Sequence, residues 1–243
     1  MHITIIIHMF NTDLYEEMKG YIQQVEKVYP NTRAIFTVPP EFIPPDKNYL
    51  FIPIENKGVD VYGFMLAIEF MRKYKLKTDW ILKIHSKISN TNMFTPNVTD
   101  YHWRKQLIQP LVHPAFLPYL KTFNKVGYIG SSIHHLRQDR DFHQNKQGIG
   151  YLITQFPTIP SSSAGFIGGN MFWIHPSVVD QYITPAFIQY CKPLFSPRKP
   201  PSNDSKYPII EYVIERILPG NMCWGLRYIL IHQDGTFTIK GTK

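Results

Sequence analysis

The chain has 243 residues, of which 44% are hydrophobic and 18% are charged, a composition typical of a globular protein with a sizeable core. No stretch approaches the roughly 18 consecutive apolar residues that a membrane-spanning helix requires, which excludes a spanning protein. The net charge of +8 favours anionic partners such as nucleotide diphosphates, but the positive side chains are too scattered to indicate a nucleic-acid-binding protein.

The first 90 residues predict strands that alternate with helices. Apolar residues at helical spacing indicate two helices, one over residues 14–28 and one that begins at Asp60, its N-cap, and ends in the basic turn around Lys75. Apolar runs predict four buried strands, at residues 2–8, 34–38, 49–54 and 80–84. This β-α-β-β-α-β order predicts a mostly parallel sheet, whose ligands bind in the loops after the strands.

The N-terminal strand and the cysteines bear on the cellular compartment of the protein. Its apolar run has no basic flank before it and no small-residue cleavage site after it, so it does not resemble a signal peptide. The two cysteines, Cys191 and Cys223, are too few for a disulfide framework and agree with a reducing compartment. Nothing in these residues directs secretion.

The second half of the chain is less regular. Its pattern predicts a helix over residues 103–111, a strand over residues 125–129, and a late helix within IIEYVIERIL at residues 209–218. In the late helix, Glu211 and Glu215 are four residues apart and share one face. We expect one α/β domain of the Rossmann type, with a mostly parallel sheet flanked by helices.

Residues 55–88 contain the most informative pattern. A strand leads into a glycine turn, a capped helix, a second strand and the polar triplet His85-Ser86-Lys87 at the carboxyl end of that strand. A glycine turn lets backbone amides approach a ligand, and the triplet supplies a cation and hydrogen-bond donors. This order of elements is suited to a diphosphate.

In this region the chain resembles the family 2-like GT-A glycosyltransferases, where an Asn-x-Gly element, a helix and an apolar strand precede an Asp-x-Asp triplet that holds a divalent metal. His85-Ser86-Lys87 stands where that triplet would be. A lysine ammonium brings its own positive charge in place of a metal ion. The resemblance therefore implies metal-independent stabilisation of the leaving diphosphate, with Mn²⁺ or Mg²⁺ as the alternative.

A closer resemblance is to the rhamnan synthesis protein F family. It is carried, in the family's order between residues 55 and 217, by the blocks ENKGVD, LKIHSK, WRKQLI, AGFIGGNMFWIHP and VIERI. The resemblance implies a cytoplasmic GT-A-like enzyme that moves a sugar, L-rhamnose above all, from a UDP or dTDP carrier to a glycan or glycoprotein acceptor with inversion. Residues 1–90 would bind the nucleotide and residues 91–243 the acceptor, within a single domain.

The expected nucleotide-sugar contacts come from three loops. They are His8, Phe10 and Asn11 after the first strand, Asn56, Gly58 and Asp60 around the glycine turn, and His85, Ser86 and Lys87. Each group has an ordinary structural alternative. The residues after the first strand can be polar loop residues with a phenylalanine that belongs to the core. Those around the glycine turn can form a simple turn and a helix cap. The third group can be a core histidine beside a solvent-exposed lysine.

The expected sugar or acceptor pocket comes from the second half. It comprises Gly168, Gly169, Asn170, Trp173 or Phe172, Trp103 and Arg104. The glycines would let backbone line a pocket with an aromatic wall, and Trp103-Arg104 resembles a Trp-Arg pair of the family. A strand-edge bulge with core aromatics, and an amphipathic helix with a buried tryptophan, explain the same residues nearly as well.

An inverting transfer also needs a general base near the acceptor hydroxyl, usually a carboxylate. In related GT-A enzymes the base lies near the start of a late helix, which implies Glu215, within the family's Ile-Glu-Arg element, or Glu211. The alternatives are Asp139, Asp141 and Asp204. A solvated Glu-Arg pair on a helix surface is the ordinary explanation for Glu215 and its neighbour.

Two other functions compete with glycosyl transfer. One is a GT-A-like module that binds a nucleotide or glycan without turnover, which nucleotide binding without sugar release would reveal. The other is a nucleic-acid-binding protein, suggested only by the net charge and the aromatic content, which steeply salt-dependent binding to DNA or RNA would reveal.

Overall fold

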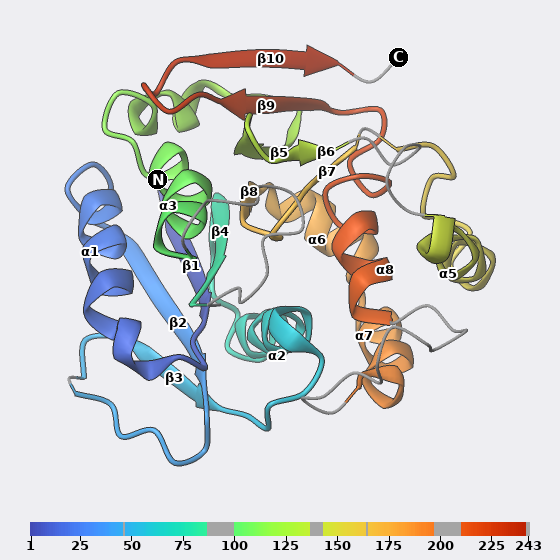
Figure 1. Ribbon diagram of the computed structural model, residues 1–243, viewed down its shortest axis with the longest axis horizontal. Coiled ribbons are helices and arrows are strands. Elements are labelled where there is room, and N and C mark those ends of the chain that lie inside the picture. Colours follow the sequence, from blue (N-terminus) through green and yellow to red (C-terminus); the bar gives the residue numbers. More distant parts are fainter. Residues whose placement is uncertain (46, 87–99, 137–142, 164, 197–209, 242–243) are drawn as a thin grey trace.

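The structure, a computed structural model, describes residues 1–45, 47–86, 100–136, 143–163, 165–196 and 210–241. Its centre is an eight-stranded sheet with the order β10-β9-β5-β8-β4-β1-β2-β3, shown in Figure 1 with β9 and β10 at the top. The strands are β1 (Ile3–His8), β2 (Thr32–Val38), β3 (Leu50–Pro53), β4 (Trp80–His85), β5 (Val126–Ser131), β8 (Phe172–Ile174), β9 (Arg227–Ile231) and β10 (Phe237–Gly241). A separate two-stranded sheet pairs β6 (His135–Leu136) with β7 (Phe166–Ile167).

The main sheet is mostly parallel. Strands β1 to β4 are parallel to one another, which confirms the strand and helix order predicted for the first 90 residues. Every residue of β1 and of β4 is buried, as expected of strands covered on both faces. Strands β5 and β9 are also parallel to each other, whereas β8 is antiparallel to both β4 and β5, and β10 to β9.

Helices cover both faces of this sheet. Helix α2 (Val59–Lys73) packs on β1 and β2 and contacts α8 (Ile210–Ile217). Helices α1 (Tyr15–Glu26) and α3 (Asp100–Leu111) are joined by an ion pair, and Figure 1 shows them on the side opposite α2. The remaining helices are η1 (Thr12–Leu14), η2 (Leu117–Thr122), α5 (His143–Gln155), α6 (Pro176–Tyr182), α7 (Pro185–Cys191) and η3 (Lys192–Leu194).

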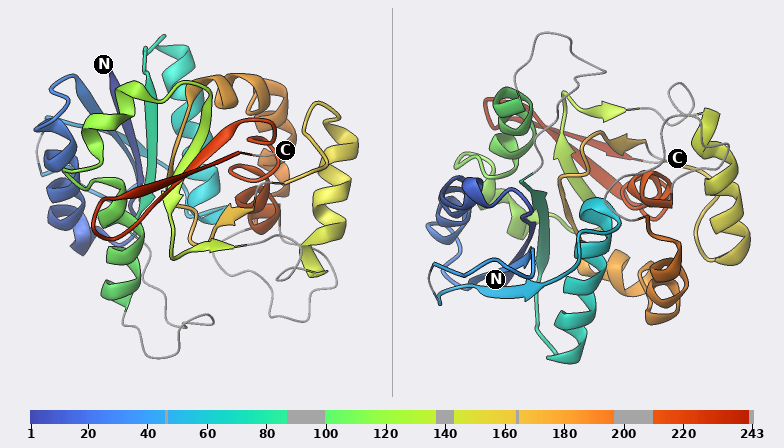
Figure 2. Two further views of the ribbon diagram at one scale, coloured as in Figure 1. Left: turned by 90° about the horizontal axis from the view of Figure 1, so that it is seen from above. Right: turned by 60° about the horizontal axis from the view of Figure 1, so that its bottom comes forward.

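Both halves of the chain contribute to the one sheet. Strand β8, from the second half, lies between β4 and β5, and Figure 2 shows the β9–β10 hairpin extending the same sheet. Helix α5 lies at the periphery beside α8. The buried thiols of Cys191 and Cys223 are free. Within the ranges described, no helix has both the length and the apolar character to cross a membrane.

The predicted N-cap of α2 is wrong by two residues. The helix begins at Val59, and its N-cap is Gly58, whose φ of 62° is left-handed. A Cβ on Gly58 would lie 2.6 Å from the Tyr62 Cβ and 2.8 Å from the Phe195 ring, so both the backbone conformation and the space require glycine. Asp60 lies inside the first turn, and its carboxylate accepts hydrogen bonds from the sheet side instead of capping the helix.

Candidate functional site

The loops that follow β1 and β4 meet at the carboxyl edge of the sheet. The two strands are neighbours, with His8 opposite His85. Beyond them the Ser86 amide donates to the His8 carbonyl at 2.9 Å, and the Asn11 amide donates to the Ser86 hydroxyl oxygen at 3.0 Å. The strand order reverses between β1 and β4, and open α/β sheets bind their ligands at such a point.

The His8 side chain is held rigidly under the first loop. Its Nδ1 lies 3.0 Å from the Thr37 hydroxyl oxygen, and its ring stacks on Phe10 with centroids 4.7 Å apart. A Cβ on Gly63 of α2 would lie 2.5 Å from both Nδ1 and the Thr37 oxygen, so the glycine makes room for the pair. Burial lowers the pKa of His8 to about 4, which leaves its imidazole neutral at physiological pH.

Beneath these loops, β4 carries a buried lysine. Lys83 is 1% exposed, and its Nζ forms an ion pair with Asp60 and donates to the Asn170 carbonyl oxygen at 2.8 Å. The Asn170 Nδ2 donates to the same Asp60 oxygen at 2.6 Å. The Phe64 and Phe172 ring centroids lie 5.7 Å and 5.8 Å from the ammonium. Lys83, Asp60 and Asn170 therefore form a buried polar triad inside an apolar surrounding.

Asp60 stays ionised within this buried triad. Burial by itself would raise the pKa of its carboxyl, but Lys83, His85 and His8 together hold that pKa well below its usual range. The predicted role of this carboxylate is a contact with ribose or sugar. It also has a structural role, because it accepts hydrogen bonds from two protein donors.

The turn before β8 approaches the same site from the other side. Gly169 and Asn170 have φ values of 93° and 57°, the left-handed conformation that glycine and asparagine adopt most readily. The Gly169 carbonyl oxygen lies 2.7 Å from His85 Nε2, and a Cβ on Gly169 would lie 2.7 Å from the Trp103 ring. Because β8 is antiparallel to β4, the turn that begins β8 lies beside the residues that end β4.

A narrow cleft lies between this turn, α2 and α8. Its volume is about 20 Å³, enough for one water-sized group. Two side-chain oxygens of the cleft residues, Asn170 Oδ1 and Glu211 Oε2, are buried and have no hydrogen-bond partner among the residues that the structure describes. Six residues predicted for three different roles line this one cleft: Asp60, His85, Gly169, Asn170, Glu211 and Glu215.

Glu211 is the more buried of the two carboxylates that α8 contributes. It is 2% exposed, and its Oε1 accepts from the Ser196 amide at 2.6 Å. Burial raises the pKa of its carboxyl, although that hydrogen bond and the charge of Lys57 oppose the rise. Glu215, one turn later, is half-buried. A buried carboxylate with one free oxygen and a raised pKa is suited to accept a proton.

Three predicted pocket residues lie away from the cleft. Trp173 is fully buried in β8, where its Nε1 donates to the Leu111 carbonyl at 2.9 Å. Arg104 forms hydrogen bonds of 2.8 Å and 2.6 Å with the two oxygens of Glu17. Gly168 packs on the strand pair β6–β7. The expected aromatic wall is therefore part of the core, and Arg104 belongs to the contact between α1 and α3.

The Asn56–Gly58 turn is covered by another part of the chain. The Gly58 amide donates to the Ser196 carbonyl at 2.9 Å, and the Phe195 ring packs against Gly58. The backbone amide expected to approach a ligand thus has a protein acceptor. The remaining predicted or alternative residues, Lys87, Asp139, Asp141 and Asp204, lie outside the described residues.

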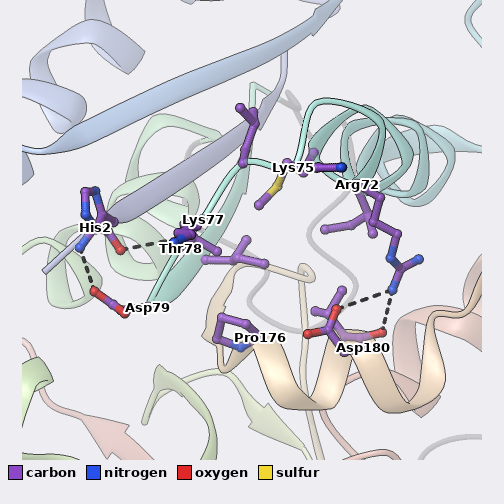
Figure 3. A pocket seen from close by; sticks show the side chains of 13 residues that line it. His2, Arg72, Lys75, Lys77, Thr78, Asp79, Pro176 and Asp180 are labelled. Atoms are coloured by element: carbon purple, nitrogen blue, oxygen red, sulfur yellow. Dashed lines mark hydrogen bonds and ion pairs between the residues drawn. The ribbon is translucent and has the colours of Figure 1, made fainter.

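A larger cavity, of about 440 Å³, lies at the opposite edge of the sheet. Figure 3 shows Arg72 of α2 facing Asp180 of α6 across it, with a nitrogen–oxygen distance of 3.6 Å, and the His2 amide bonded to Asp79. None of the predicted site residues lines this cavity. Size alone favours this cavity, but the small cleft holds the two buried oxygens that lack a partner among the described residues, so we place the candidate site there.

In the part of the chain that the structure describes, no three side chains of His, Cys, Asp or Glu lie together in a way that could hold a metal ion. Comparison of the chain with models of protein families, with curated proteins and with solved structures found no match. The geometry of the cleft is therefore the basis for assigning a function.

Lys83 is the residue of this site that the sequence pattern did not single out. Its strand, WILKIH, is buried along its whole length, and a lysine in such a strand requires an anionic partner. That requirement is readable from the sequence. The partners are not, because Asp60 is 23 residues away and Asn170 is 87 residues away.

Proposed function

We propose that this chain is a GT-A-type glycosyltransferase that moves a sugar, L-rhamnose in the first place, from a UDP- or dTDP-sugar to a glycan or glycoprotein acceptor with inversion. The observation that carries the proposal is a convergence at one sheet edge. The loops of His8 and Ser86, suited to a nucleotide, adjoin a cleft whose carboxylates and free acceptor oxygens suit sugar hydroxyls. The resemblance of five sequence blocks to the rhamnan synthesis protein F family supports the reaction.

The nucleotide would lie across the loops that follow β1 and β4, where sheets of this order bind nucleotides. Phe10 is half-buried and stacked on His8, and it offers apolar surface to a base or ribose. The net charge of +8 attracts the diphosphate. Lys87, two residues after His85, would supply the cation that stabilises the leaving diphosphate without a metal.

In the transfer, the acceptor hydroxyl oxygen forms a bond to the anomeric carbon as the bond from that carbon to the diphosphate oxygen breaks. The hydroxyl proton passes to a carboxylate, and the electron pair of the broken bond leaves with the nucleoside diphosphate. Glu211 is favoured over Glu215 as the base, because its Oε2 is buried with no partner in the ranges described and burial raises the pKa of its carboxyl.

The alternative is a module that binds a nucleotide or glycan without turnover. One observation favours the nucleotide-binding form of this module: a cleft of about 20 Å³ admits a hydroxyl-sized group but not a whole sugar ring. Turnover would therefore require the cleft to widen between α2 and α8.

A panel of nucleotides and nucleotide sugars separates these functions. The melting temperature of the protein and the release or transfer of sugar are measured with UDP, dTDP, UDP-sugars and dTDP-rhamnose, with and without EDTA. We expect stabilisation by one nucleotide and sugar transfer that EDTA leaves unchanged. Stabilisation without any sugar release would establish the binding module, and no stabilisation by any compound would remove both functions. Activity lost in EDTA and restored by Mn²⁺ would contradict metal independence.

A further inference from the structure

Lys83 is costly to bury, which makes its presence informative. A buried ion pair repays the desolvation of its two charges only when its geometry is good, and well-packed apolar residues often stabilise a fold as well or better. Here the lysine lies in the central strand β4, between the rings of Phe64 and Phe172, where an apolar side chain would be the ordinary choice. Stability alone therefore does not account for a lysine at this position.

The bonds of Lys83 connect the two walls of the cleft. Asp60 belongs to the first turn of α2, and Asn170 belongs to the left-handed turn before β8. The lysine ammonium binds the carboxylate of the first and the backbone carbonyl of the second. The Asn170 Nδ2 closes the triad by donating to Asp60, which fixes the orientation of the side-chain amide.

This orientation leaves one atom available. The Asn170 Nδ2 donates to Asp60, so the side-chain Oδ1 is left buried, with no partner in the described part of the chain, beside a space that holds one water-sized group. A buried acceptor without a donor is rare in folded proteins, and a ligand hydroxyl would satisfy it.

We infer that Lys83 is a positioning residue, which holds Asn170 so that its Oδ1 accepts a hydrogen bond from a hydroxyl group of the ligand sugar. The inference rests on the proposed function for the identity of the ligand. The positioning itself does not depend on the identity of the ligand, because the three members of the triad are bonded to one another.

The first experiment separates positioning from stability. Lys83→Met leaves the Asp60 charge buried without its cation and should lower the melting temperature strongly. The double variant Lys83→Met with Asp60→Asn removes both charges and should recover most of that loss. Asp60→Asn alone reports what the carboxylate contributes directly. The matched control is Lys192→Met with Glu69→Gln, which removes a half-exposed ion pair of 2.7 Å that does not line the cleft.

The second measurement is hydrogen exchange of the backbone amide of Asn170, which donates to the Ile167 carbonyl at 2.9 Å. Its exchange is compared with that of the β1 amides, so that a global loss of stability cancels. In the double Lys83 variant we expect the Asn170 amide to exchange about tenfold faster relative to β1. The control pair should keep the wild-type ratio. An unchanged ratio in the double variant would overturn the inference, whether or not any nucleotide binds.

The third measurement concerns the ligand. Titration calorimetry gives Kd for UDP or dTDP and for the matching nucleotide sugar. The double variant and Asp60→Asn should bind the nucleotide alone with equal Kd, but the double variant should bind the sugar-bearing form about tenfold more weakly than Asp60→Asn does. An equal Kd for the sugar-bearing form in these two variants would show that Lys83 is structural only. If the wild type binds no nucleotide sugar, the proposed function fails, and the exchange ratio alone decides the positioning.

Discussion

At the level of single residues, the site is governed by groups whose charge depends on burial. His8 is neutral in the folded protein, because burial lowers its pKa to about 4. Asp60 remains ionised, because the positive charge around it outweighs the effect of burial. The two groups affect the free energy of unfolding in different pH ranges. His8 affects it between the unfolded and the folded pKa of its imidazole, and Asp60 only in stronger acid.

The first prediction follows from His8. The unfolded chain binds a proton on this side chain near pH 6.5, whereas the folded protein does not until the pH approaches about 4, so stability is fully present above pH 6.5 and is lost as the pH falls. The loss amounts to up to about 3 kcal/mol. Urea denaturation of His8→Gln between pH 7.5 and about 4.5 should give a flatter profile than the wild type.

His2→Gln, at the exposed start of the chain, is the control and should keep the wild-type profile. Burial also lowers the pKa of His134 and His175, so part of the slope will remain in His8→Gln. A profile for His8→Gln that is as steep as the wild type would contradict the assignment.

The second prediction concerns Glu211, the proposed general base. Glu211→Gln keeps the shape of the side chain but removes proton acceptance, so kcat should fall by about 10²- to 10⁴-fold while the protein stays folded. Glu215→Gln, on the same helix and in the same cleft, is the matched comparison and should retain most activity. The opposite order of the two variants, measured as initial rates of sugar transfer, would move the role to Glu215.

The third prediction concerns Lys87. Replacement by alanine should lower the rate of transfer by orders of magnitude with the melting temperature unchanged, because a cation opposite a departing diphosphate contributes several kcal/mol in the transition state. Lys77→Ala, at an exposed position on the opposite edge of the sheet, is the control. Wild-type rates in Lys87→Ala would refute the role.

Some residues of the site could be predicted from the sequence, and others could not. The polar residues after β1 and β4 were predictable, because the ends of parallel strands meet at one edge. Trp173 was placed in a pocket although it lies in the core, because a local pattern of glycines and aromatics does not reveal which face of a strand is covered. The partners of Lys83 depend on contacts between distant segments, which no local pattern contains.

At the level of elements, the start of α2 is the clearest case of local constraint. Gly58 combines a left-handed φ of 62° with close packing by Tyr62 and Phe195. The same residue was expected to serve a ligand, whereas its amide donates to Ser196. A structural requirement explains this glycine without a ligand.

The fourth prediction tests that requirement. Gly58→Ala should destabilise the protein by about 1–3 kcal/mol, because a Cβ is disfavoured at this φ and would meet two side chains. Gly20→Ala in α1, where no atom lies within 4 Å of the added Cβ, should instead stabilise it by about 0.5–1 kcal/mol. Chemical denaturation measures both, and a neutral Gly58→Ala would show that the turn can relax.

The elements of the first half were more predictable than those of the second. Strands β1 to β4 and helices α1 and α2 were expected from long apolar runs and clear helical spacing. Helices α6 and α7 have only seven residues each, and each begins with a proline, so their periodicity is too short to detect. The hairpin of β9 and β10 has a partly exposed pattern that resembles a loop.

At the level of the whole molecule, the excess of positive charge acts on any anionic ligand. The fifth prediction is that Kd for the bound nucleotide rises several-fold between about 0.05 M and 0.3 M salt, because screening weakens the attraction. Calorimetry at several salt concentrations measures this rise. A double-stranded DNA oligonucleotide serves as the comparison and should bind only weakly. Salt-independent nucleotide affinity would show that the net charge has no part in binding.

The sheet as a whole was predictable only in class. Alternating strands and helices indicate a mostly parallel sheet, and that is what the structure has. The position of β8 between β4 and β5, and its reversed direction, depend on pairing between segments about 90 residues apart, such as Leu82 with Trp173. Strand order therefore had to come from the structure.

The reversal of β8 has a consequence for divergence among related chains. Strand β8 is only three residues long, and its two ends face opposite edges of the sheet. Residues inserted at Gly169 would enter the mouth of the cleft, whereas residues inserted at His175 would emerge at the far edge. Lengthening one short turn would thus change the shape of the cleft, with the rest of the scaffold left intact.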